Sequence, residues 1–333
     1  MGSLEQGARN AVTVCMGVKP GERVVLVTDR LVPTVGDALE RAARNVTPHV
    51  TRVTLEDLGP RPLTTLPEAL SKAASEADVT FWATQSVKGE LPMRMAFRRL
   101  VQQRARHGHM PGVTPLLMET GMCANYDEVA DLTLRLHKFV QGKRTARVTN
   151  PVGTDFTVEF NPEWRWLADT GKFHTPKTWG NLPAGETYTA PFRLHGRIVT
   201  HLLGDHFSEK YGELKTPLSF EVRDSWIDMD SFRGATPEIV REFKEYLLSD
   251  PNGPRAAEFA CGTNTGLTRL VGNLLQDEKI PGVHVAFGHP YSDLTGAPWT
   301  ANTHVDVVIL KTDVWFDGIQ VQREGQYLMQ NLR

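Results

Sequence analysis

The sequence contains few cysteines and places them far apart. Its 333 residues include three, at Cys15, Cys123 and Cys261, with no CxxC pair, so neither a disulfide framework nor a zinc knuckle is implied. No apolar run approaches the ~20 residues of a membrane span. The formal net charge of −2 gives no electrostatic reason to expect nucleic acid or an anionic membrane as a partner. With no recognisable signal peptide, we expect a soluble, cytoplasmic protein.

Nucleotide-binding and serine-hydrolase motifs are also missing. The segment 28–34, which follows the first predicted strand, contains no glycine. The chain has no GxxxxGKS/T, no GxGxxG and no GxSxG, which argues against a phosphate-binding loop and a nucleophile elbow. Arginines between residues 94 and 106 recur beside apolar residues at helical spacing. We interpret them as a solvated helix face rather than an anion site.

The first part of the chain alternates apolar, strand-like runs with amphipathic helical segments. Strands are predicted at 23–28, 49–55, 78–83 and 114–118, and helices at 35–44, 66–77, 91–107 and 126–140. Such alternation is typical of a mostly parallel sheet with helices on both sides. The sequence therefore predicts an α/β scaffold domain over residues 1–143.

The pattern changes after residue 144. Residues 145–160 alternate in polarity around a turn at 150–153, and Asp317-Gly318 separates two further strand-like runs. Both are hairpin signals. A helix is predicted after Thr236, with Pro237 at its first position. We expect residues 144–333 to form an α+β, largely antiparallel domain that carries the metal-binding and catalytic residues.

The most informative stretch runs from Gly282 to Ile309. Residues two apart on a strand point to the same face, so His304 and Asp306 are expected to project together, and His284 lies on the preceding strand-like segment. An imidazole beside a carboxylate can form half of a divalent-metal site. The alternative is a core histidine whose polar atoms are satisfied by the neighbouring aspartate.

Two glutamates and a tyrosine add to this pattern. Glu258 lies among small apolar residues, where a carboxylate is costly to bury unless a cation accompanies it. Glu186 follows a Pro/Gly turn and, taken alone, is explained as a solvated residue. Tyr291 follows His284 by seven residues, within a loop whose glycines and prolines oppose regular structure. Cys261 has no base near it in the sequence, and we interpret it as a small buried thiol.

Together these segments resemble the thermophilic-type metallo-aminopeptidase family (peptidase family M29). The resemblance rests on four segments in order, with Asp317-Gly318 after them: Asn181–Glu186, Glu258–Asn264, His284–Gly288 with Tyr291, and His304–Asp306. It implies two divalent metal ions (zinc, cobalt, manganese or magnesium) bound by Glu186, Glu258, His284, His304 and Asp306.

The resemblance also implies a chemistry. Two divalent metals can share one hydroxide, lower the pKa of bound water and polarise a scissile carbonyl. In the family, the residue at the position of Glu258 is a candidate proton shuttle, and the tyrosine at the position of Tyr291 a candidate stabiliser of the oxyanion. The implied substrate is a small peptide or amide with a free amine, and the implied assembly is a homodimer. The sequence does not separate a broad aminopeptidase from a hydrolase dedicated to one metabolite.

Two alternatives remain open. The 2,5-dihydroxypyridine 5,6-dioxygenases resemble the chain more distantly and use one iron held by two histidines and an aspartate, which here would have to be His284, His304 and Asp306. The presence of both Glu186 and Glu258 favours the hydrolase. A metal-stabilised binding protein without activity would be indicated by a missing ligand residue, and none is missing.

Overall fold

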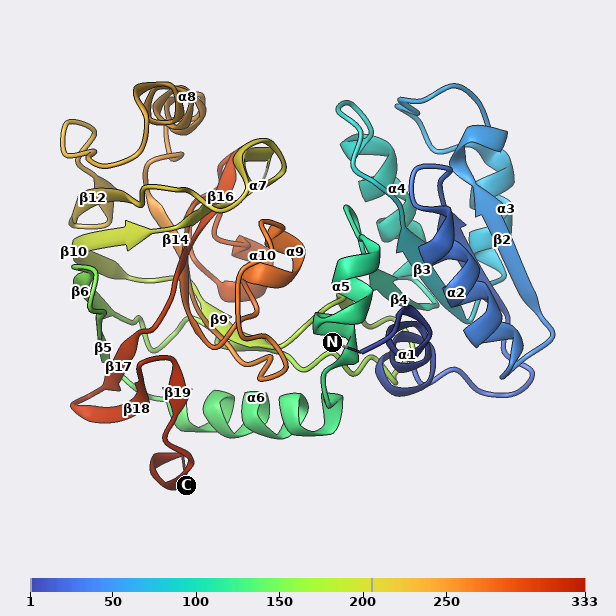
Figure 1. Cartoon of the computed structure of the whole chain (residues 1–333), viewed down its shortest axis with the longest axis horizontal. Helices are drawn as coiled ribbons and strands as arrows, with labels where there is room; N and C mark the ends of the chain where they lie inside the picture. Colours follow the sequence, from blue (N-terminus) through green and yellow to red (C-terminus); the bar gives the residue numbers. More distant parts are fainter. Residues whose placement is uncertain (1, 205, 333) are drawn as a thin grey trace. The chain divides into compact units, whose positions relative to one another are not determined.

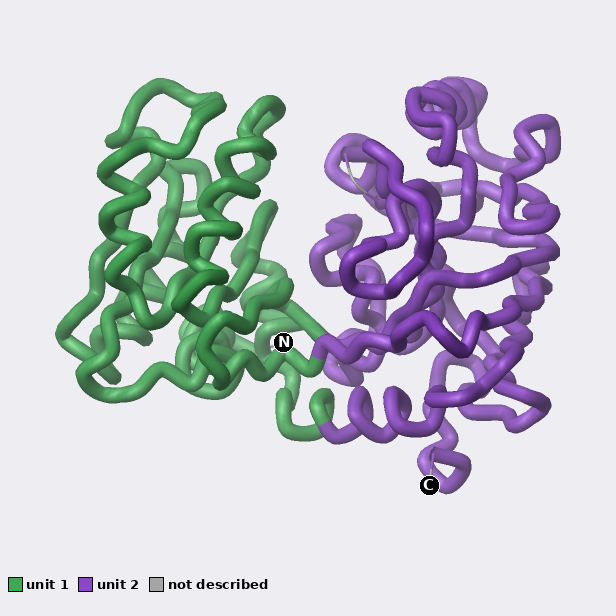
Figure 2. The backbone as a smooth tube through the Cα atoms, turned by 180° about the vertical axis from the view of Figure 1, so that it is seen from behind, with its two compact units in different colours: residues 1–130, 170–184 green, residues 131–169, 185–333 purple. Residues whose placement is uncertain are grey.

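The computed structural model describes residues 2–204 and 206–332, and the chain divides into two compact units, coloured separately in Figure 2. Unit 1 comprises residues 1–130 and 170–184, and unit 2 comprises 131–169 and 185–333. The single boundary expected at 143/144 is thus replaced by three crossings. The first crossing lies inside α6 (Tyr126–Val140), because its Leu132, Leu136 and Val140 pack in the core of unit 2. The other two arise because residues 170–184 return to unit 1, where residues 179–181 join its sheet.

Unit 1 contains the predicted parallel sheet. Its strands are β1 (Val24–Thr28), β2 (Val50–Thr54), β3 (Val79–Ala83), β4 (Arg106–His109) and β8 (Trp179–Asn181), in the order β2-β1-β3-β4-β8, with every pair parallel. Its helical segments are α1 (Leu4–Arg9), η1 (Asn10–Cys15), α2 (Pro33–Arg44), η2 (Leu55–Asp57), α3 (Glu68–Ser75), α4 (Leu91–Val101), α5 (Pro115–Glu119) and η3 (Gly121–Cys123) (Figure 1). Val25 and Val27 of β1 pack with α3 and α4, while α2 lies against Thr28 on the other face.

Two predictions in unit 1 are wrong. Residues 114–118 form helix α5 and not a strand, because Thr114 Oγ1 accepts a hydrogen bond from Leu117 N (3.3 Å) and Pro115 occupies the first helical turn. The fourth strand is β4, whose first two residues, Arg106 and His107, lie at the end of the predicted helix 91–107. Arg106 is consequently a buried strand residue and not part of a solvated face.

Unit 2 contains two antiparallel sheets, as predicted. The eight-stranded sheet has the order β13-β12-β10-β6-β5-β17-β18-β19, and the six-stranded sheet β11-β16-β15-β14-β9-β7. Their strands are β5 (Thr145–Thr149), β6 (Asp155–Glu159), β7 (Leu167–Asp169), β9 (Glu186–Thr189), β10 (Arg193–Thr200), β11 (Leu202–Leu203), β12 (Leu218–Arg223), β13 (Trp226–Ile227), β14 (Ala256–Gly262), β15 (Gly282–Gly288), β16 (His304–Ile309), β17 (Asp313–Phe316), β18 (Ile319–Arg323) and β19 (Gln326–Tyr327). The helical segments are α7 (His206–Tyr211), α8 (Pro237–Leu248), α9 (Leu274–Asp277), α10 (Ser292–Thr295) and η4 (Met329–Asn331). The hairpins predicted at 150–153 and at Asp317-Gly318 join β5 to β6 and β17 to β18.

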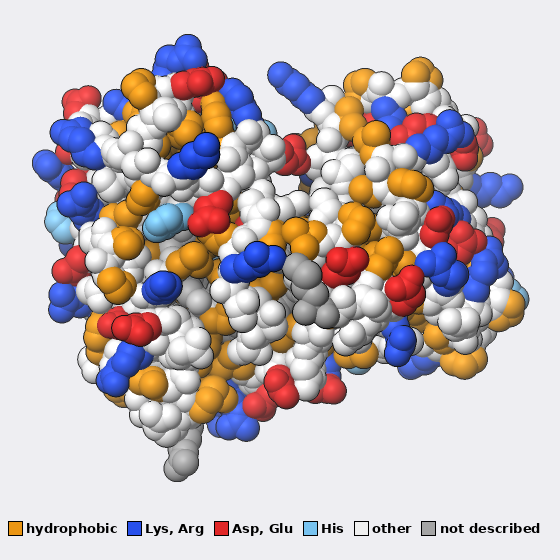
Figure 3. Space-filling model, in the orientation of Figure 1, with side chains coloured by type: hydrophobic (Ala, Val, Ile, Leu, Met, Phe, Trp, Pro, Cys, Tyr) orange, Lys and Arg blue, Asp and Glu red, His pale blue; other side chains and the backbone are white. Residues whose placement is uncertain are grey.

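An aromatic core joins the two sheets of unit 2. Phe156 and Phe220 come from the eight-stranded sheet, and Phe259 and Phe287 from the six-stranded sheet, all within one buried cluster. On the face of the molecule that Figure 3 shows, acidic and basic side chains are interspersed, in keeping with the small net charge. Among the described helices, none is both long and apolar enough to cross a membrane.

Candidate metal centre

The candidate ligands lie on the face of the six-stranded sheet opposite the aromatic core. Val283, Val285 and Phe287 of β15 point into that core, so the intervening His284 points to the other face. On β14, a β-bulge between Ala256 and Glu258 changes which face the side chains point to. Ala256 packs in the core, and the extra residue at the bulge turns Glu258 onto the opposite face with His284.

The strand register brings the carboxylates together. Ala286 of β15 pairs with Glu258 on β14 and with Asp306 on β16, so these three residues form one row across the sheet. Because Ala286 has only a methyl side chain, the longer side chains on either side can converge above it. His284 lies two residues before Ala286 on β15 and so on the same face, and Glu186 enters from β9, which pairs with β14.

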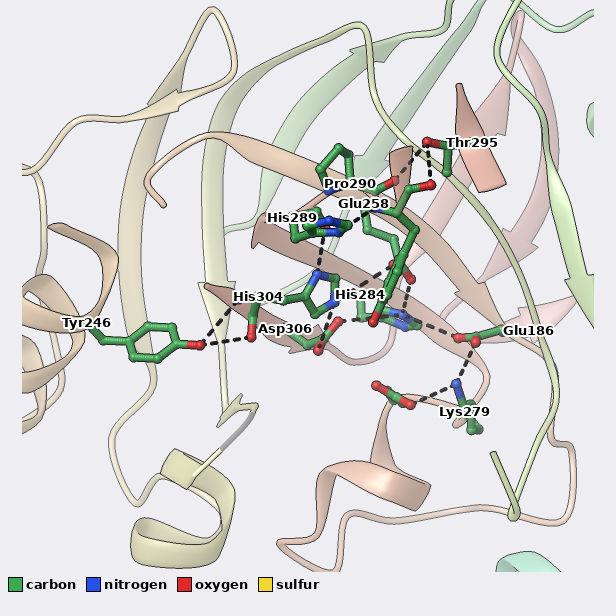
Figure 4. A network of polar contacts seen from close by, with 12 residues as sticks. Glu186, Tyr246, Glu258, Lys279, His284, His289, Pro290, Thr295, His304 and Asp306 are labelled. Carbon is green, nitrogen blue, oxygen red and sulfur yellow. Dashed lines mark hydrogen bonds and ion pairs between the residues drawn. The ribbon is translucent and has the colours of Figure 1, made fainter. Parts of the chain in front are cut away.

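His304 is oriented by a backbone hydrogen bond. Its Nδ1 lies 2.8 Å from the carbonyl oxygen of His289, which can only accept a hydrogen bond, so Nδ1 carries a proton. The other nitrogen, Nε2, is then directed toward the carboxylates, 3.7 Å from Asp306 Oδ2 and 3.9 Å from Glu258 Oε2 (Figure 4). A histidine fixed in this way through Nδ1 presents Nε2 to a metal. Tyr246 of α8 secures the same strand end, since its hydroxyl contacts His304 N and O.

His284 is surrounded by three carboxylates. Its Nε2 lies 3.3 Å from Glu258 Oε1, 3.4 Å from Glu186 Oε2 and 3.9 Å from Asp306 Oδ1. All four side chains are buried. The structure thus gathers the five residues proposed as ligands at one place in unit 2, and the predicted shared face of His304 and Asp306 is present in β16.

Tyr291 also reaches this place. Its ring centroid is 4.8 Å from that of His304. Its backbone is left-handed (φ 50°), an uncommon conformation for a tyrosine. The residue precedes a short helix, α10, so the loop after Gly288 is more regular than its glycines and prolines suggested. Tyr291 is 39 % exposed, yet desolvation and the charges of Glu258 and Asp306 raise its pKa well above the ordinary value, which keeps the phenol protonated.

The charges of the site alter the basicity of its histidines. Burial disfavours a charged imidazole, but the hydrogen bond to Glu258 and the charge of Glu186 outweigh it and raise the pKa of His284 to about 9. Burial acts in the same way on His304, where the charge of Asp306 prevails and raises the pKa to about 10. Both rings therefore attract a cation, either a proton or a metal, at neutral pH.

Sequence reasoning missed Lys279 and Glu278, which precede β15. Lys279 Nζ lies 2.5 Å from Glu186 Oε1 and 2.7 Å from Glu278 Oε1, and its side chain is 2 % exposed. A lysine beside a glutamate in a polar segment is ordinarily a surface pair. The only local signal was Ile280-Pro281, which shows that the next strand begins immediately.

No protein-family model and no curated protein sequence matches the chain. Several solved structures do resemble it, among them an aminopeptidase and a dioxygenase. Wild-type AmpT from Thermus thermophilus, an aminopeptidase, superposes with a TM-score of 0.72 at 16% identity, over 98% of this chain and 98% of that chain. The 2,5-dihydroxypyridine dioxygenase from Pseudomonas putida KT2440 superposes with a TM-score of 0.70 at 14% identity, over 99% and 98%. These likenesses establish the two-domain α/β fold, with both neighbours enzymes.

The residues present suit a divalent cation. Two groups have their ligand atoms within 4.8 Å of one another: Glu186, Glu258 and His284, and Glu278, His284 and Asp306. Glu186 Oε2 is buried and accepts no hydrogen bond from the described part of the chain, which is costly for a carboxylate oxygen unless a cation lies nearby, either a metal ion or the protonated ring of His284 at 3.4 Å. Mixed imidazole and carboxylate ligands suit zinc, cobalt, manganese and magnesium.

Proposed function

We propose that the protein is a metal-dependent hydrolase, aminopeptidase-like, that cleaves an amide bond of a small peptide or peptide-like metabolite bearing a free amine. The observation that carries the proposal is the convergence of Glu186, Glu258, His284, His304 and Asp306 on one buried face, with Tyr291 against His304. The fold likeness to AmpT supports the same class of enzyme.

The proposed roles follow from where each side chain lies. A divalent cation, when bound, would polarise the scissile carbonyl and make a water molecule acidic. Glu258 faces both histidines and is proposed to take the proton of that water and deliver it to the leaving amine. Tyr291 keeps its phenolic proton and is proposed to donate a hydrogen bond to the developing oxyanion. The buried carboxylates of the site, Glu186, Glu258 and Asp306, are proposed to attract the substrate's ammonium group.

The direct test uses metal-reconstituted full-length protein and paired substrates. Apo protein loaded with Zn²⁺, Co²⁺ or Mn²⁺ is incubated with dipeptides that carry a free amine and with the same dipeptides acetylated at the amine. Mass spectrometry follows release of the free amino acids. We expect cleavage of the free-amine peptides only. Absence of cleavage with every metal would reject the peptidase assignment.

A ring-cleaving dioxygenase with a single iron is the second candidate. Two imidazoles and one carboxylate, from His284, His304 and Asp306, have the composition of the 2-His-1-carboxylate iron site, and the dioxygenase neighbour superposes almost as well as AmpT. Oxygen consumption by the Fe²⁺-loaded protein with 2,5-dihydroxypyridine measures this activity. Glu186 and Glu258, which that iron site does not require, favour the hydrolase.

A further inference from the structure

Lys279 is a buried cation inside the carboxylate cluster (Figure 4). Its ammonium approaches one oxygen of Glu186 (2.5 Å) and one oxygen of Glu278 (2.7 Å). Both contacts are at or below the ~2.7–2.9 Å usual for a charge-assisted hydrogen bond between an ammonium and a carboxylate. The lysine therefore already provides a positive charge at the end of the site where these two glutamates meet.

The backbone fixes Lys279 in this position. Its N–H donates to Gln276 O (2.9 Å), and its carbonyl accepts from Asn264 N (2.9 Å). Gly262 of β14 lies against the same segment, and a Cβ on that glycine would come within 2.7 Å of the Lys279 carbonyl carbon. The absence of a side chain at residue 262 thus permits the close approach that carries Nζ to Glu186.

Each of the two groups of possible metal ligands contains one carboxylate that Lys279 engages. Glu186 belongs to one group, Glu278 to the other, and both groups contain His284. Two cations could not both bind the same nitrogen of His284. A divalent cation at Glu186 or Glu278 would also lie beside the ammonium, and like charges repel strongly in a buried site.

Four candidate ligands remain that Lys279 does not contact: the Nε2 atoms of His284 and His304 each lie 3.3 to 3.9 Å from an oxygen of Glu258 and an oxygen of Asp306. Within the described chain, the lysine forms no ion pair with Glu258 or Asp306, whose oxygens surround the two imidazoles. Two nitrogen and two oxygen ligands are enough for one divalent cation.

We propose that the centre binds one divalent cation through Glu258, His284, His304 and Asp306, and that the Lys279 ammonium takes the place of a second cation between Glu186 and Glu278. This inference deepens the proposed function and rests on its metal centre. The proposal gives one metal ion per chain, whereas the sequence resemblance implies two. Counting the bound metal distinguishes these possibilities.

Manganese provides the count and a spectroscopic signature. Apo full-length protein is equilibrated with Mn²⁺, dialysed and analysed for metal per chain, and electron paramagnetic resonance distinguishes an isolated Mn²⁺ from a coupled pair. We expect one Mn²⁺ per chain with the isolated signal. Two per chain with a coupled signal would overturn the inference and leave the hydrolase proposal intact. No bound Mn²⁺ would overturn both.

Two variants test the role of the lysine. Lys279→Met should raise the count from one to two, because Glu186 and Glu278 lose their ammonium partner, whereas Lys138→Met, at an exposed position of α6, should leave it at one. A count of one in folded Lys279→Met would contradict the inference.

Since Lys279→Met leaves buried carboxylates unpaired and can impair folding, Glu186→Gln in the otherwise unchanged protein provides the second test. The Glu186→Gln variant should retain one Mn²⁺ per chain. If the variant binds no Mn²⁺, Glu186 is a metal ligand and the proposed four-residue ligand set is wrong.

Discussion

At the scale of single residues, Glu258 is the carboxylate that lies between the two histidines of the candidate site. Its two oxygens face different histidines, Oε1 at 3.3 Å from His284 and Oε2 at 3.9 Å from His304. Replacement by glutamine keeps the shape of the side chain and removes its basicity. Because Glu258 is also a proposed ligand, the variant is assayed at a metal concentration that saturates its site. We therefore expect Glu258→Gln to lower kcat by a factor of roughly 10² to 10⁴, the usual contribution of a general base, with little change in the far-UV circular dichroism spectrum.

The neighbouring Cys261 supplies the control for that variant. It lies three residues along the same strand, and its side chain packs in the aromatic core on the opposite face. Burial raises the pKa of its thiol to about 12, so the thiolate form is negligible at neutral pH. Cys261→Ala should keep its peptidase activity. Equal losses in Cys261→Ala and Glu258→Gln would indicate damage to β14 and not removal of a base.

Tyr291 is proposed to act on the oxyanion and not on the metal. The proposed hydrogen bond forms only as negative charge develops, so Tyr291→Phe should lower kcat by about 10²-fold while KM and bound metal stay nearly unchanged. Steady-state kinetics beside metal analysis checks both. A variant that loses its metal would instead show that the ring, which packs on His304, holds the ligand in place.

At the scale of the element, the row of residues across β14, β15 and β16 depends on a small side chain at Ala286. Its methyl group lies between Glu258 and Asp306. Ala286→Leu would place an isobutyl group where those carboxylates converge, so we expect metal affinity to fall by at least about tenfold, equivalent to about 1.4 kcal/mol. Ala286→Gly leaves the space open and should bind metal as the unaltered protein does. Isothermal titration of both variants with Mn²⁺ measures the difference.

The buried histidines of β4 make unit 1 sensitive to acid. Burial, with a contribution from the charge of Arg98, lowers the pKa of His107 to about 3, and burial also lowers that of His109 well below its ordinary value. In the unfolded chain both titrate near pH 6.5. The unfolded state therefore binds more protons below that pH, and the stability contributed by the neutral rings, complete above about 6.5, is lost as the pH falls toward 3.

This effect is measurable by urea unfolding between pH 7 and pH 5. Each buried histidine should make the free energy of unfolding fall by up to about 1.4 kcal/mol per pH unit below its unfolded-state pKa. His107→Asn can keep a hydrogen bond to Thr80, the present partner of Nδ1 at 2.8 Å, and should show a shallower fall. If the free energy of unfolding falls with pH equally steeply in the unaltered protein and in His107→Asn, this explanation is wrong.

Local periodicity predicted much of the fold and part of the candidate site. The shared face of His304 and Asp306 follows from two-residue spacing on a strand, and the Asp317-Gly318 hairpin from its turn residues. The prediction failed at Thr114–Met118, where a short apolar run fits a strand or a helix equally well and the cap at Thr114 decides.

Other parts of the site depend on contacts that no local pattern contains. Lys279 is buried only because Gly262, seventeen residues earlier, lets the chain pass close to β14. Glu258 faces His284 because of the bulge after Ala256, and a bulge cannot be recognised from residue types in one strand. Non-local backbone geometry therefore fixes what periodicity leaves undetermined.

At the scale of the whole molecule, every candidate ligand belongs to unit 2, although the chain passes between the units three times. Each unit has its own buried core. A cation that binds the folded site and not the unfolded chain stabilises only the unit that contains the site, by about 2.7 kcal/mol at one hundred times its dissociation constant. We therefore expect Mn²⁺ to slow hydrogen exchange in peptides from β14, β15 and β16 and to leave β1 and β3 unchanged. Mass spectrometry of the apo and Mn²⁺-loaded protein resolves these segments. Equal slowing in both units would show that they unfold as one cooperative body, and slowing confined to unit 1 would place the cation elsewhere.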